Sequence, residues 1–143
     1  MGQLKLEERL EKLDKTLVTI AHRFGVLSEV TFREAMRGVL EKYFGAIAQH
    51  WTYYDREGIV YGELSIIEVD VVVRDGTHIL VEVKSRVDTG DVLELVRIAK
   101  LYEKVEKVKP RLAIVGDFIH PRAKELVKRL GVDIYGYLEE TIA

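Results

Sequence analysis

The 143-residue chain contains no cysteine and no asparagine, and it has only two glutamines. Without cysteine, neither a disulfide framework nor a thiolate zinc site is possible. No apolar run is long enough to cross a bilayer, and the N-terminus lacks a signal-peptide pattern. We therefore expect a cytoplasmic protein without a membrane contact. The shortage of amides beside abundant Glu, Lys, Arg and Val is typical of a thermophile.

The composition is that of one soluble globular domain with a sizeable core, because 48% of the residues are apolar and 32% are charged. The formal net charge of −2 argues against a basic protein that coats nucleic acid non-specifically, although a local basic face remains compatible with it. The four histidines, at positions 22, 50, 78 and 120, do not cluster at metal-ligand spacing.

The first segment predicts an amphipathic helix. Apolar residues recur at alternating steps of four and three, which forms a heptad seam: Leu6, Leu10, Leu13, Leu17, Ile20 and Phe24. Such a helix either packs on its own domain or forms a dimeric coiled coil, and both readings stay open. We divide the chain into an N-terminal coiled-coil-like helix over 1–24 and a domain over 25–143.

The remaining segments predict a mixed α/β sheet flanked by helices, in the order α-β-β-β-α-β-α-β. Capping residues and C-terminal glycines predict the ends of the helices, and runs of β-branched apolar residues predict the strands. Residues 59–63 are read as a short extension or an edge strand. The predicted helices cover 29–44, about 88–105 and 121–130, and the strands cover 47–54, 66–74, 77–84, 111–116 and 132–135.

The hairpin over 66–84 is unusual because it places Asp70, Glu82 and Lys84 among branched apolar residues. Buried charges without partners are costly, so these groups either pair with one another or form a site. A two-residue Asp75-Gly76 loop would pair position 70 with 81 and put the two carboxylates on opposite faces. A three-residue loop, with Arg74 added and Gly76 left-handed, pairs 70 with 80 and makes Asp70 diagonal to Glu82. A shared site thus requires an odd loop or a bulge.

Two carboxylates at one place can hold Mg²⁺ or Mn²⁺, which prefer oxygen ligands. A metal ion there would polarise a phosphodiester and activate a bound water. Lys84 would position that water or neutralise negative charge at the phosphate. A carboxylate from the preceding helix would complete the set. The structural alternative is a buried ion-pair network that supports the hairpin.

These residues resemble the PD-(D/E)XK nuclease superfamily, whose fold is called restriction-endonuclease-like. Asp70 matches its first motif, Glu82-Val83-Lys84 matches its (D/E)-x-K motif, and the order of elements matches its α-β-β-β-α-β core. The chain is similar to archaeal Holliday-junction resolvases and to uncharacterised domains with an N-terminal coiled coil.

The resemblance implies a Mg²⁺- or Mn²⁺-dependent endonuclease that acts on DNA. We expect a homodimer through the N-terminal helix, which would place two such sites for cutting two strands. Asp70 and Glu82 would bind the metal and Lys84 would position the nucleophilic water. The helix carboxylate of the family would be Glu29, with Glu34 as the alternative.

Two departures from the family pattern bear on activity. Val69 replaces the proline of the first motif, and Ile98 stands where some branches carry a glutamine, although their tyrosine is matched by Tyr102. Arg97 and Lys100 either contact phosphate or form a solvated helix face. The alternative to a nuclease is a catalytically inactive member of the fold that binds nucleic acid or serves as a coiled-coil assembly module.

Overall fold

The computed structural model describes residues 29–135 and 138–139. The helix predicted over 4–24, with its coiled-coil dimer, lies outside these residues and stays a prediction. The predicted order of elements is confirmed, with a 3-10 turn and a short last strand in addition. The elements are α2 (Glu29–Phe44), η1 (Gly45–Ile47), β1 (Ala48–Asp55), β2 (Ser65–Asp75), β3 (Thr77–Val87), α3 (Thr89–Glu106), β4 (Arg111–Ile119), α4 (Pro121–Leu130), β5 (Val132–Tyr135) and β6 (Leu138–Glu139).

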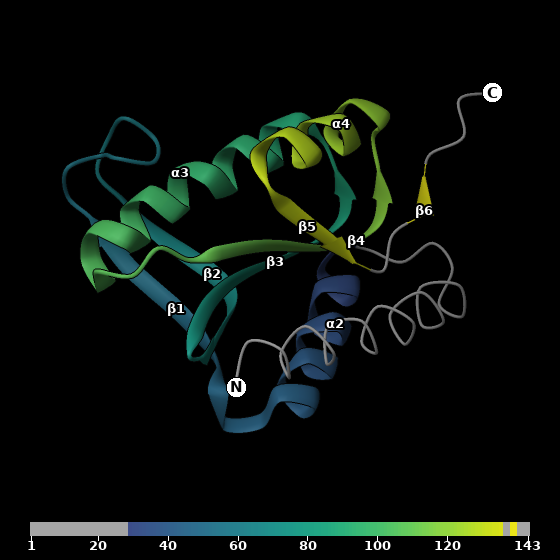
Figure 1. Cartoon of the computed structure of the whole chain (residues 1–143), viewed down its shortest axis with the longest axis horizontal. Coiled ribbons are helices and arrows are strands. Elements are labelled where there is room, and N and C mark those ends of the chain that lie inside the picture. Colours follow the sequence, from purple (N-terminus) through teal and green to yellow (C-terminus); the bar gives the residue numbers. More distant parts are fainter. Residues whose placement is uncertain (1–28, 136–137, 140–143) are drawn as a thin grey trace.

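The strands form one mixed sheet in the order β1-β2-β3-β4-β5, with β6 paired to β4. The pairs β1–β2 and β2–β3 are antiparallel, whereas β3–β4, β4–β5 and β4–β6 are parallel. Helix α2 covers one face of the sheet, and helices α3 and α4 cover the other (Figure 1). The predicted mixed α/β architecture flanked by helices is therefore confirmed.

Each face of the sheet has its own apolar core. On the α3 and α4 face, buried residues such as Leu80, Leu95 and Val127 form one cluster. On the α2 face, Met36 and Leu40 pack against Val81 and Val83 of β3. The central strand β3 contributes to both clusters from alternating positions, as do its neighbours β2 and β4, so these three strands join the two layers.

The ends of the helices follow from their capping residues. Asp88 and Asp91 form a reciprocal capping box at the start of α3. Pro121 occupies the first turn of α4, and Gly131 ends that helix in a left-handed conformation. No helix in the described part of the chain is both long and apolar enough to span a membrane.

Residues 59–63 are not an edge strand, which corrects one of the two readings. The carboxylate of the buried Asp55 accepts a hydrogen bond from the Val60 N–H at 3.0 Å and folds the segment back as a loop. Gly58 has a φ of +68°, and a Cβ there would lie 2.7 Å from the backbone nitrogen of Glu63. The close backbone approach thus requires glycine and interrupts the extended conformation.

Candidate active site

The turn between β2 and β3 is shorter than expected. Asp75 pairs with Thr77, and Gly76 alone lies between them with a φ of +73°. The odd number of loop residues agrees with the requirement for a shared site, but the three-residue loop is wrong. The observed register pairs Val71 with Val81. Continued by one residue, this register places Asp70 directly across from Glu82 rather than diagonal to it.

A bulge in β2 changes the direction of Asp70. Gln49 of β1 pairs with Val72, whereas Trp51 pairs with Val69, so three steps on β2 match two steps on β1. The extra residue falls at the Asp70–Val71 step. His50, which lies between the two paired residues of β1, places its Nδ1 3.3 Å from the carbonyl oxygen of Asp70.

The two carboxylates lie where β2 and β3 stop pairing. The last paired residues are Val71 and Val81, and beyond them side chains replace the backbone ladder. The Val83 N–H donates to Oδ2 of Asp70 at 2.9 Å, and the Asp70 N–H donates to Oε1 of Glu82 at 3.3 Å. Asp70 and Glu82 therefore meet at the point where the two strands stop pairing.

Arg33 of α2 is the cation that balances this pair. Its Nη2 donates to Oδ1 of Asp70 at 2.8 Å, and the Asp70 side chain is only 2% exposed. The pKa of Arg33 is raised, first by this hydrogen bond and further by the charges of Asp70, Glu82 and Glu29. Burial, together with the neighbouring Asp70, raises the pKa of Glu82 to about 8. Without metal, the guanidinium of Arg33 thus balances Asp70, and near neutral pH a proton on Glu82 neutralises the second carboxylate.

Lys84 faces the other helical layer. Its Nζ lies 3.2 Å from Oδ1 of Asp91, and the other carboxylate oxygen of Asp91 accepts the N–H of the N-cap residue Asp88. Burial opposes the charge of Lys84, but Asp91 and Glu29 outweigh it and raise the pKa of the ammonium. The start of α3 therefore holds Lys84 in position and favours its charged form.

Glu29 lies at the first turn of α2 and contacts β3. Both the N–H and the hydroxyl of Ser85 donate to its Oε2, the N–H at 2.9 Å, while its Oε1 is buried without a hydrogen-bond partner. The alternative residue, Glu34, is exposed. Within residues 29–135 and 138–139 no three acidic or histidine side chains are grouped closely enough to hold a metal ion. The structure thus brings Asp70 and Glu82 together but places Glu29 beside Ser85.

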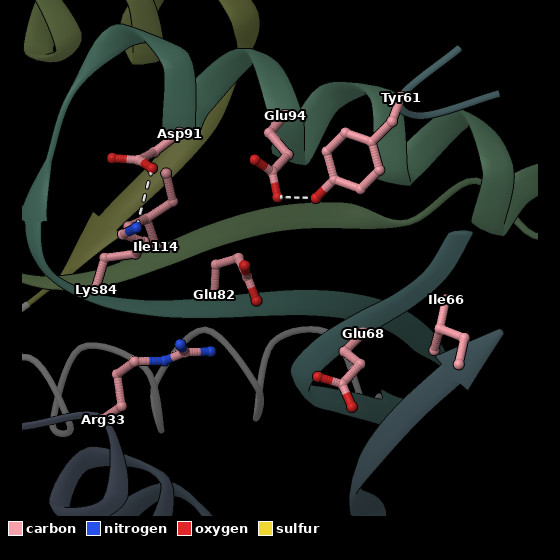
Figure 2. Close-up of a pocket in the computed structure, with 9 residues that line it drawn as sticks. All are labelled: Arg33, Tyr61, Ile66, Glu68, Glu82, Lys84, Asp91, Glu94 and Ile114. Atoms are coloured by element: carbon pink, nitrogen blue, oxygen red, sulfur yellow. Dashed lines mark hydrogen bonds and ion pairs between the residues drawn. The ribbon is translucent and has the colours of Figure 1, made fainter. Parts of the chain in front are cut away.

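A pocket of about 220 Å³ opens beside Glu82. Arg33 approaches from the α2 layer and Asp91 and Glu94 from α3, with Glu82 and Lys84 between them (Figure 2). The Tyr61 hydroxyl donates to Glu94 at 2.7 Å. Burial, followed by this contact with Glu94, raises the pKa of Tyr61 to about 12. The lining residues are Arg33, Tyr61, Ile66, Glu68, Glu82, Lys84, Asp91, Glu94 and Ile114.

Three of these residues were missed by the sequence reasoning. Arg33 follows Glu29 by four positions, so the two share one face of α2, and that spacing was a usable signal. Asp91 was recognised only as an acid of the first helical turn. Tyr61 belongs to the loop that was read as an extension or strand, and no local pattern points it toward the pocket.

The donor set fits a hard divalent cation. Asp70 and Glu82 present carboxylate oxygens at one place, and the raised pKa of Glu82 shows that the pair lacks positive charge. Asp70 and Glu82 are the residues that would hold such an ion. When bound, it would supply Lewis-acid activation of a phosphodiester and of water.

The mixed sheet thus carries two carboxylates at its opened hairpin and a lysine two residues further along β3. The model of the PD-(D/E)XK nuclease superfamily matches residues 65–133. A second model, described as a protein of unknown function (DUF3782), matches residues 2–63. No curated protein matches the chain.

Two solved structures share the fold. One is a repair endonuclease from Pyrococcus abyssi, with 18% identity, a TM-score of 0.51, and coverage of 82% of this chain and 50% of that one. The other is a complex of EndoMS with double-stranded DNA, with 18% identity, a TM-score of 0.51, and coverage of 84% of this chain and 49% of that one. This chain thus spans about half the length of these structures. The predicted restriction-endonuclease-like core is confirmed.

Proposed function

We propose that the domain is a metal-dependent DNA endonuclease that hydrolyses phosphodiester bonds with an activated water. The observation that carries this proposal is the carboxylate pair of Asp70 and Glu82, which replaces the backbone ladder between β2 and β3. A structural ion-pair network would place a cation on each acid, whereas here burial and Asp70 raise the pKa of Glu82. The match of residues 65–133 to the PD-(D/E)XK nuclease model supports the same chemistry.

We assign the roles as follows. Asp70 and Glu82 bind Mg²⁺ or Mn²⁺. Lys84, held in its charged form by Asp91, positions the nucleophilic water and stabilises negative charge on the phosphate. Glu29 assists as the helix carboxylate: it orients Ser85, next to Lys84, and its free Oε1 remains available to the site.

Nucleic acid, and DNA in particular, is the proposed partner. One structure that shares the fold is titled as a complex with double-stranded DNA, so duplex DNA is the first substrate to test. A homodimer formed through residues 4–24 would present two sites, as cleavage of a duplex or a junction requires. Light scattering tests the dimer: the full chain should have twice the mass of one copy. A variant with Leu10→Glu and Leu17→Glu should halve it, and an equal mass for both would refute the coiled coil.

A catalytically inactive nucleic-acid-binding or coiled-coil assembly module is the second candidate. Its support is Ile98, which occupies the position of the glutamine found in some branches and is buried in the core, only 1% exposed. No amide group is thus available at that position of α3.

A cleavage assay separates the two functions. Duplex, flap and four-way-junction DNA are incubated with the full chain and Mg²⁺ or Mn²⁺, beside Asp70→Ala. Asp133→Asn serves as a matched control, because it removes an acid from a partly exposed ion pair with Arg111 away from the pocket. Cutting by wild type and by Asp133→Asn, but not by Asp70→Ala, supports the nuclease. No cutting by wild type, or cutting that survives Asp70→Ala, would favour the inactive module.

A further inference from the structure

Arg33 occupies the side of Asp70 at which a metal ion would bind. Asp70 has two carboxylate oxygens, and its Oδ2 is already engaged by the Val83 N–H. The remaining oxygen, Oδ1, is held by the Arg33 guanidinium at 2.8 Å. A cation that binds this carboxylate beside Glu82 therefore competes with a positive charge that is already in contact with it.

The connection of Arg33 to the rest of the protein is weak enough for displacement. Its side chain is 41% exposed, although the Asp70 side chain is only 2% exposed. Its Nε is buried without a hydrogen-bond partner. Arg33 thus gains one charged contact in this position and leaves one donor unsatisfied, and movement toward the open pocket returns that donor to water.

We propose that Arg33 is a displaceable counter-ion of Asp70, which neutralises the site in the absence of metal and lowers its affinity for a divalent cation. This inference rests on the proposed metal-dependent function. It differs from that function because it concerns how the site is kept empty, and it assigns this role to a residue outside the family motifs. Once displaced, Arg33 remains a lining residue of the pocket.

Mn²⁺ titration calorimetry without DNA tests the proposal on the full chain. Arg33→Gln removes the competing charge, so Mn²⁺ should bind about tenfold more tightly than to wild type. Arg33→Lys keeps the charge, and its affinity should stay within about threefold of wild type. Glu82→Gln is the control that removes a metal ligand and should abolish binding in both backgrounds.

Thermal unfolding supplies a readout that does not depend on activity. Arg33→Gln leaves the buried Asp70 carboxylate without its cation, so the metal-free variant should melt at a lower temperature than wild type. Because a ligand stabilises a protein according to its affinity, Mn²⁺ should raise the melting temperature of Arg33→Gln by more than that of wild type. If Arg33→Gln is too unstable to purify without metal, recovery of the folded variant in Mn²⁺ but not in its absence supports the proposal.

The outcomes separate this inference from the proposed function. If wild type binds Mn²⁺ and Arg33→Gln binds it no more tightly, the counter-ion role is refuted and the metal site stands. If neither protein binds Mn²⁺, the metal-dependent function fails and the inference fails with it. Binding by Arg33→Gln alone would support the inference strongly.

Discussion

Both ends of the β2–β3 hairpin contain partly or fully buried ionisable groups, but the groups at the two ends have different partners. At the turn end, Oε1 of Glu106 accepts hydrogen bonds from the Trp51 indole at 3.0 Å and from Arg74 at 3.1 Å. The Tyr102 hydroxyl lies 2.7 Å from Nδ1 of His78. One acid thus meets one cation and one neutral donor, which is how a structural network satisfies a charge.

At the open end, by contrast, two carboxylates share one guanidinium. Asp70 forms an ion pair with Arg33. The pKa of Glu82 is raised because its carboxyl group is buried and lies near the negative charge of Asp70. At one end of the hairpin an acid therefore meets a cation and a neutral donor, whereas at the other end two acids share one cation. The excess of negative charge at the open end, more than burial of charge as such, is the feature that supports the proposed cation site.

The largest expected effect is on cleavage. Asp70→Asn removes the charge of a metal ligand but keeps an oxygen that can accept the Val83 N–H. We expect cleavage to fall by about a thousandfold or more, because a metal ion bound there would supply most of the activation of water and phosphate. The measurement is single-turnover cleavage of duplex or junction DNA in Mg²⁺. At the turn end, Glu106→Ala should cleave at nearly the wild-type rate at a temperature where it is folded. An equal loss of cleavage in Asp70→Asn and Glu106→Ala would contradict the proposed difference between the two ends of the hairpin.

The second effect is a pH dependence of stability without metal. The pKa of Glu82 is raised from 4.5 to about 8 in the folded chain, so between these values the folded protein holds a proton that the unfolded chain has released. Stability should therefore fall as the pH rises from about 4.5 to about 8, with a slope of at most about 1.4 kcal/mol per pH unit, and level off above.

Denaturant unfolding of wild type and Glu82→Gln at pH 5, 6, 7 and 8 isolates this contribution. The free energy of unfolding of wild type, relative to that of Glu82→Gln, should decrease as the pH rises. The other titrating groups are common to both proteins and cancel in this comparison. A difference that is constant across this range, or that favours wild type more as the pH rises, would contradict the raised pKa.

The third effect concerns stability at the turn end. Glu106→Ala leaves the Trp51 indole N–H and Arg74 without their acceptor, so the free energy of unfolding should fall by about 2 kcal/mol. Glu103→Ala is the matched control, because it removes an exposed acid from the same helix and should change stability by less than about 0.5 kcal/mol. Urea denaturation measures both variants. If Glu106→Ala were as stable as Glu103→Ala, the turn-end network would not be structural.

The smallest effect is expected at Asp91. Asp91→Asn keeps an oxygen for the capping bond from Asp88, but it removes the ion pair with Lys84. We expect kcat to fall about tenfold with little change in KM, since Lys84 would lose its fixed position and not its charge. Steady-state kinetics and the melting temperature are measured together. A lower melting temperature with unchanged kcat would assign Asp91 to helix capping alone.

The sequence predicted the elements better than the geometry of the site. Pro121 and Gly131 correctly predicted the two ends of α4, and the acidic residues near Asp88 predicted the start of α3. The odd turn and the bulge agree with the requirement for a shared site, but neither of the two loop lengths considered is the observed one. A single left-handed glycine can reverse the chain, and local sequence does not distinguish this turn from a longer loop. The bulge at Asp70 depends on pairing with β1, which lies outside the hairpin.

The residue types of the site were predictable, but their partners were not. Asp70, Glu82 and Lys84 stood out as charges inside apolar strands. Arg33 and Asp91 come from helices on opposite faces of the sheet, so their contacts depend on tertiary packing that no local pattern encodes. His50 contacts Asp70 only because of the bulge.

Mn²⁺ binding to wild type, Glu82→Gln and Glu106→Gln tests the central claim most directly. The two variants make the same change of an acid to its amide at opposite ends of one hairpin. The account predicts that wild type and Glu106→Gln bind Mn²⁺ with the same affinity and that Glu82→Gln does not bind it. Equal binding by all three proteins, or no binding by wild type and by Arg33→Gln alike, would contradict the claim that the open end of the hairpin is a metal site.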